Sequence, residues 1–84
     1  MFKLELPGNL NADEDIMLAM VKRFGHNLAK GNQSIKDNYD IVMAAVLKNG
    51  DAIYYASPRL QGDKKIVLAA VKQIISVNGD PFSK

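Results

Sequence analysis

The side chains that could carry out chemistry in this chain are few and lie apart in the sequence. His26 is the only histidine, and there is no cysteine. A catalytic or metal-binding histidine needs further ligands or a partner that positions it. Because the sequence offers no second histidine or thiolate, we expect His26 to be a structural or surface residue at a helix end. We expect no metal site and no cofactor.

The other polar groups do not form a recognisable catalytic pattern either. The acidic residues Asp13, Glu14 and Asp15 lack the spacing of a calcium loop and suit the first turn of a helix. No serine lies in a Gly-x-Ser-x-Gly sequence, and there is no Gly-x-x-x-x-Gly-Lys-Ser/Thr phosphate-binding loop. The sequence therefore predicts a protein that is not an enzyme, with no catalytic or cofactor-binding residues and no small-molecule ligand.

Tyr54 and Tyr55 are adjacent aromatic residues in a predicted short helix. Neighbouring helical side chains point about 100° apart, so only one of the two is easily buried. We expect Tyr55 in the core and Tyr54 towards the surface. A partly buried rim tyrosine is the favoured interpretation of Tyr54, and an exposed interface residue is the alternative, since tyrosine is common in interfaces. The candidate interaction surface comprises Tyr54, His26, Lys64, Lys65 and Phe2.

The charge balance gives little support to nucleic-acid binding. The net charge is +2, from eleven lysines and arginines against nine acids, and the two signs are interspersed. A helix–turn–helix in residues 39–57 is disfavoured, because its second helix has no basic residue to meet a phosphate. A small nucleic-acid-associated protein remains the alternative function. It would require one face to gather Lys22, Arg23, Lys64, Lys65 and Lys72.

The elements that must position these side chains recur every twenty-five residues. Three copies, near 13–37, 38–62 and 63–79, make up a single domain over residues 1–84. The matching positions include the predicted N-caps Asp13, Asn38 and Asp63, the isoleucines Ile16, Ile41 and Ile66, and the valines Val21, Val46 and Val71. Such a period is typical of stacked helical units that bury their apolar faces against one another.

Caps and composition predict main helices at 14–24, 39–49 and 64–77. Gly25 and Gly50 are expected to end the first two in the left-handed conformation. Shorter helical turns are expected near 27–30 and 34–36, and over 51–57 with Asp51 as the cap. Ser57 and Pro58 should start a further turn.

The third copy departs from the pattern, because residues 74–77 are inserted before the next Asn-Gly-Asp sequence. The last helix should therefore be one turn longer and end at Gly79. At the other end, Phe2, Leu4 and Leu6 alternate with polar residues. They predict an extended arm that covers one end of the core, or pairs with a second chain. The fold class is thus all-α, with three main helices, short linking helices and this arm.

One long stretch resembles a known family. It runs Asp40-Ile-Val-Met-Ala-Ala-Val-Leu-Lys-Asn-Gly-Asp-Ala-Ile-Tyr-Tyr-Ala-Ser57 and continues through Leu60 into Asp63-Lys-Lys-Ile-Val-Leu-Ala-Ala-Val-Lys-Gln73. This stretch is similar to the bacterial and protist repeat called domain of unknown function 4116, well over residues 38–73 and weakly over 13–28. The resemblance implies tandem small helical units and brings no catalytic residues. The positions that it marks look like packing and capping positions.

The expected function is a non-catalytic protein–protein interaction module, with a protein partner or a second copy of itself. Nucleic acid is not expected as a partner. The longest apolar run, residues 41–47, is far shorter than the roughly twenty residues of a membrane span, so no membrane partner is expected. No secretory signal pattern is visible in the sequence, and we expect a cytoplasmic protein.

Overall fold

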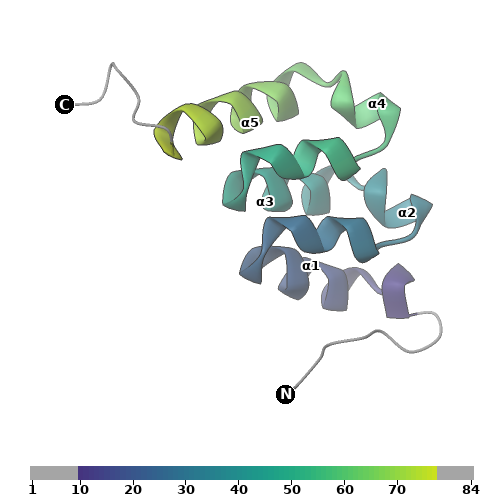
Figure 1. Ribbon diagram of the computed structural model, residues 1–84. Coiled ribbons are helices and arrows are strands. Elements are labelled where there is room, and N and C mark those ends of the chain that lie inside the picture. The colour runs from purple at the N-terminus through teal and green to yellow at the C-terminus, as the bar shows by residue number, and fades with distance from the viewer. Residues whose placement is uncertain (1–9, 78–84) are drawn as a thin grey trace.

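The computed structural model describes residues 10–77 and shows the predicted all-α fold (Figure 1). The three main helices are α1 (Glu14–Arg23), α3 (Tyr39–Lys48) and α5 (Lys64–Val77), which agree with the predicted ranges to within one residue. The linking elements are the 3₁₀ helices η1 (Leu10–Ala12), η2 (Gly25–Lys30) and η3 (Gly50–Tyr55) and the short helices α2 (Gln33–Lys36) and α4 (Pro58–Gln61). No strand occurs in this range. The predicted arm at Phe2, Leu4 and Leu6 and the predicted helix end at Gly79 lie outside the described residues.

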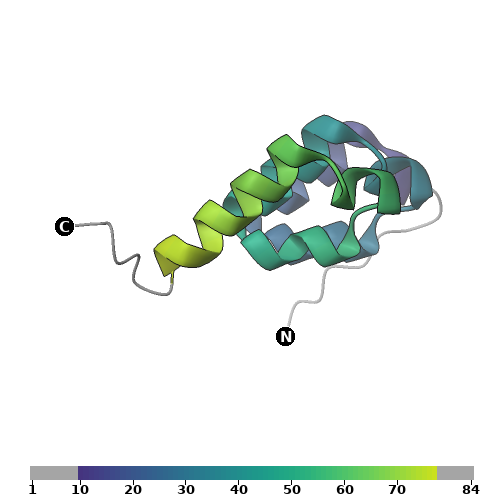
Figure 2. The same ribbon diagram turned by 90° about the horizontal axis from the view of Figure 1, so that it is seen from above.

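The helices stack in two rows (Figures 1 and 2). In one row α3 lies between α1 and α5, and in the other η2 packs against η3. The 3₁₀ helices η2 and η3 each also contact the main helix before and the main helix after them, and α2 and α4 connect the rows at one edge. The core lies between the rows. Its fully buried side chains include Met17, Val21, Leu28, Ile35, Val42, Val46, Leu60 and Ile66.

The helices begin where the sequence predicts. Asp13, Asn38 and Asp63 each accept a hydrogen bond from the backbone N–H three residues later, at Ile16, Ile41 and Ile66. These bonds satisfy N–H groups that have no partner inside the helix. Ser57 caps α4 in the same way, and Pro58 occupies the first helical position, as predicted. Asp51 is not a cap, because η3 already begins at Gly50.

The predicted role of Gly25 and Gly50 is wrong. Helices α1 and α3 end at Arg23 and Lys48. The next residues, Phe24 and Asn49, are extended, and each glycine then starts the next 3₁₀ helix. The glycines are needed because the following unit comes very close. A Cβ atom at Gly50 would lie 2.5 Å from the backbone oxygen of Ala70, and one at Gly25 would meet the backbone oxygen of Ala45.

The same glycines carry a polar link between units. The Gly25 N–H donates to Asn49 Oδ1, and the Gly50 N–H donates to Gln73 Oε1, both at 2.8 Å. Gln73 lies 24 residues after Asn49, one residue fewer than the repeat period of twenty-five. The shift arises because α3 ends at Lys48 and leaves Asn49 extended, whereas α5 continues as a helix through this position.

A second polar link joins α2 to α4. Ser57 Oγ donates to Asp37 Oδ1 at 2.6 Å, and Arg59 Nε donates to the same oxygen at 2.9 Å. These two hydrogen bonds, helped by the positive charge of Arg59, lower the pKa of Asp37 below its usual range. The backbone is joined here as well, since the Ser57 N–H donates to the Lys36 oxygen and, one unit earlier, the Asn32 N–H donates to the Asn11 oxygen.

Gly50→Ala should destabilise the protein by about 1–3 kcal/mol, because the added methyl group overpacks the contact with Ala70 and Ile74. Urea unfolding followed by circular dichroism measures this change. Gly62→Ala is the matched control, since the nearest atom to its Cβ would lie 3.8 Å away, in ordinary contact. Equal unfolding midpoints for the two variants would contradict the close-approach role of Gly50.

Asp37→Asn should reduce the acid sensitivity of folding. Because the folded-state pKa of Asp37 is lowered, the carboxylate stabilises the fold above the ordinary aspartate pKa of about 4. That contribution is lost as the pH falls through the lowered folded-state pKa. As the pH falls below about 4, the free energy of unfolding should therefore fall less steeply in the variant than in the wild type. Arg59→Met should flatten the same part of the profile, and unchanged profiles in both variants would rule out the link.

Candidate functional site

The structure separates the predicted interaction residues. Tyr54 is 78% exposed on η3, more than the partly buried rim position favoured from the sequence, and Lys64 and Lys65 are exposed in the first turn of α5. His26 lies on η2, and Phe2 lies outside the described residues. These positions are spread over three different elements.

His26 joins two consecutive units. Its Nε2 atom lies 2.7 Å from Asp51 Oδ1, and both side chains are about half exposed. The imidazole ring also meets the ring of Tyr55 edge-on, with the centroids 6.2 Å apart. Within residues 10–77, no three His, Cys, Asp or Glu side chains come together as metal ligands would. His26 therefore has the contacts of a residue that connects η2 to η3.

The predicted burial of Tyr55 is wrong, because its side chain is 40% exposed. The buried positions of this segment belong to the small side chains of Ala52 and Ala56. Element η3 packs closely against both α3 and α5, so the space between them takes a methyl group and not a phenol ring. The Tyr55 ring lies instead at the rim, beside His26.

The basic residues named for a nucleic-acid interface do not gather either. Lys22 and Arg23 lie in the last turn of α1, at one end of the stack. Lys64, Lys65 and Lys72 lie on α5, on the far side of α3. Helix α3 therefore separates the two basic residues of α1 from the three of α5.

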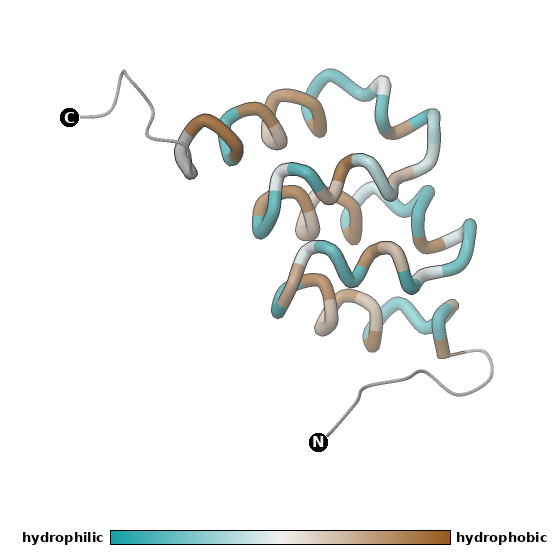
Figure 3. The backbone as a smooth tube through the Cα atoms, viewed as in Figure 1, coloured by the Kyte–Doolittle hydropathy of each residue, from teal (hydrophilic) through white to brown (hydrophobic). Residues whose placement is uncertain are grey.

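The feature that sequence reasoning missed is an apolar surface on α5. We call it the α5 surface and define it by four side chains that are between 37% and 46% exposed: Leu68, Val71, Ile74 and Ile75. Figure 3 shows hydrophobic residues recurring along this helix towards its end. The sequence signal that could have indicated this surface was the place of Val71 in the repeat. Val21 and Val46 are completely buried, whereas Val71, at the same place in the last unit, is 45% exposed.

This exposure marks the end of the stack. In the first two units, the main helix is covered by the next unit along the chain, and within residues 10–77 no further unit follows α5. The α1 end of the stack shows a similar loss of cover. Ile16 is only partly buried there, whereas Ile41 and Ile66, at the same place in the later units, are buried. Within residues 10–77, each end therefore lacks one of the two neighbours that cover the middle unit.

At Ile75, a following unit could not approach α5 as closely as the following units approach Gly25 and Gly50. Gly25 and Gly50 let the backbone of the following unit approach, and Ile75 stands where the third glycine would be. Residue 75 also lies inside α5, so its backbone N–H is not presented as those of the two glycines are. The next Asn-Gly-Asp sequence, at residues 78–80, lies outside the described residues.

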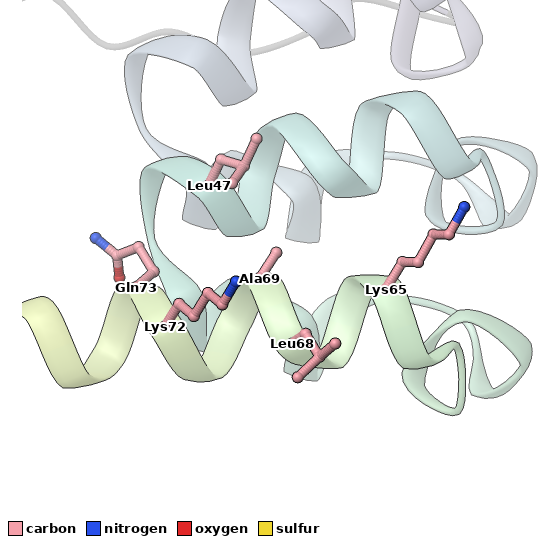
Figure 4. A pocket seen from close by; sticks show the side chains of 6 residues that line it. All are labelled: Leu47, Lys65, Leu68, Ala69, Lys72 and Gln73. Carbon is pink, nitrogen blue, oxygen red and sulfur yellow. The ribbon is translucent and has the colours of Figure 1, made fainter.

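A shallow, open groove of about 600 Å³ runs between α3 and α5, beside this surface (Figure 4). Leu47 contributes from α3, and α5 contributes Lys65, Leu68, Ala69, Lys72 and Gln73. Leu47 is 61% exposed, and in Figure 4 Lys65 and Lys72 lie on either side of Leu68. The groove thus has an apolar floor with an ammonium group towards each end. None of the helices in the described part of the chain is long and apolar enough to cross a bilayer.

Comparison with known proteins points to one family. No curated protein and no solved structure matches the chain significantly. The family described as "Domain of unknown function (DUF4116)" matches twice, over residues 13–61 and over residues 38–82. The two matches overlap in the second copy, which serves as the later half of one match and the earlier half of the other. Because each match spans more than half of the sequence, the chain belongs to the DUF4116 family.

Proposed function

We propose that this chain is a non-catalytic interaction module of the cytoplasm, which binds another protein through the α5 surface. The observation that supports this proposal is the concentration of exposed apolar side chains on one helix at one end of the stack. Contiguous apolar patches on soluble proteins mark interaction sites more often than scattered apolar residues do. Stacked helical units commonly bind partners through such extended faces.

The chemistry of the α5 surface favours protein over nucleic acid as the partner. Aliphatic side chains gain free energy when apolar atoms of a partner cover them, at roughly 25 cal/mol per Å². Phosphate groups offer no such cover, and the dispersed basic residues give no support to the nucleic-acid alternative. The partner is either a different protein or a second copy of this chain.

Leu68→Asp combined with Val71→Asp should abolish partner binding without unfolding the protein. Both side chains are nearly half exposed, so their replacement should change stability only modestly, on the scale of a surface substitution, about 0.5 kcal/mol each. Binding is measured by light scattering over a dilution series and by quantitative capture from the source cells. Phe24→Asp is the control, because Phe24 is also an exposed apolar residue, at 57%, but lies at the α1 end.

The expected result is a set of captured proteins, or a dimer, that the wild type and Phe24→Asp share and the double variant loses. A strict monomer that enriches no protein would contradict the proposal. So would a double variant that retains every partner of the wild type. Circular dichroism melting of all three proteins shows that any loss of binding is not a loss of fold.

A further inference from the structure

We infer that the groove between α3 and α5 binds a short amphipathic helix that carries acidic side chains at either end of an apolar stripe. This inference rests on the proposed function, since it names the chemistry of the partner at the same end of the stack. The groove has the two properties that such a helix would match, which are an apolar floor and a positive rim.

The apolar floor comes from both walls. Leu47 on α3 is 61% exposed, and Leu68 on α5 is 46% exposed. Ala69 is partly buried and also lines the groove, where its small side chain leaves space for a ligand side chain. A helix laid along α5 would place side chains at spacings of three and four residues against Leu47 and Leu68. Beyond Leu68, its edge would reach Val71 on the α5 surface.

The positive rim comes mainly from α5. Along residues 64–77 this helix has three lysines and no carboxylate, and Asp63 before it is engaged in capping Ile66. Lys65 and Lys72 are seven residues apart, so they lie about 10 Å, or two turns, from each other along the helix. A partner helix parallel to α5 would reach both lysines with carboxylates spaced by about two turns.

The charge is uneven along the groove, which orients the partner. Gln73 Nε2 donates to the backbone oxygen of Lys48, so Lys48 lies beside the Lys72 end and adds a positive charge there. Asp40, seven residues before Leu47, places a negative charge on the same side of α3, two turns towards its N-terminus. The more acidic end of the partner helix should therefore lie against Lys72 and Lys48.

Other occupants fit less well. A second copy docked through its own α5 would bring the lysines of the two helices together, and like charges in a contact oppose association. A further stacked unit would not meet Ile75 as the following units meet Gly25 and Gly50. A nucleic-acid strand would neutralise Lys65 and Lys72 but would leave Leu47 and Leu68 uncovered.

The test uses the full chain and two fluorescein-labelled helical peptides of about 16 residues, roughly 24 Å long. Both carry the same leucine stripe. One has glutamates about two turns apart on either side of it, and the other has lysines at the same positions. Fluorescence anisotropy at about 50 mM salt should show the acidic peptide binding at least about tenfold more tightly than the basic one. Leu68→Asp should abolish binding of the acidic peptide.

Charge reversal makes the test specific to the groove. Lys65→Glu combined with Lys72→Glu should reverse the preference between the two peptides. Lys30→Glu combined with Lys36→Glu makes the same change in net charge on η2 and α2, away from the groove, and should keep the wild-type preference. Equal binding of both peptides, or no binding of either up to about 1 mM, would overturn the inference, as would a preference that Lys65 and Lys72 do not control.

The outcomes separate this inference from the proposed function. If neither peptide binds but Leu68→Asp with Val71→Asp still loses the captured proteins, the groove inference fails and the interaction module stands. If the capture experiment also finds nothing, both fail. A single-stranded DNA oligonucleotide serves as a competitor of the acidic peptide. Displacement of the peptide with comparable affinity would show that the lysines bind any polyanion, and it would overturn the inference.

Discussion

The structure depends on one contact that occurs at each junction between units, where a glycine lies against the backbone of the next main helix. At Gly25 and Gly50 there is no room for a Cβ atom, and each N–H donates to a side-chain amide oxygen of the following unit. The contact draws the rows together, so that only small side chains fit at Ala45, Ala52 and Ala70. A hydrogen bond and a close backbone approach thus set the spacing of the whole stack.

The end of the stack follows from the loss of the same contact. At the third position the glycine is replaced by Ile75, and α5 continues as a helix where α1 and α3 stop. The valine that the next unit would cover is then left half exposed. The apolar α5 surface and the adjoining groove are therefore consequences of how the repeat terminates. Ile74 and Ile75 of the α5 surface belong to the inserted residues 74–77, whereas Leu68, Val71 and the groove residues occupy positions of the repeat.

Much of the fold was predictable because capping and periodicity are local signals. The N-caps at Asp13, Asn38 and Asp63, the start at Ser57-Pro58 and the three main helices all follow from nearby residues. The errors concern residues whose environment comes from another unit. The glycines looked like helix terminators because they follow apolar helices, and only the neighbouring helix shows that the space is already filled. Tyr55 was predicted to lie in the core, but η3 packs too closely against α5 to leave room for its ring.

The candidate site was less predictable than the fold for the same reason. Composition and spacing identified Tyr54 and the lysines of α5, yet exposure depends on which neighbour is present, and the sequence does not state that α5 lacks one. Leu47 and Leu68 are unremarkable aliphatic residues in a repeat; their meeting in one groove depends on the packing of α3 against α5. What the sequence by itself determined is the identity, order and ends of most helices, because these depend on interactions within a few residues. The tertiary structure alone decided which apolar side chains remain exposed, because burial is a property of the contacts between units.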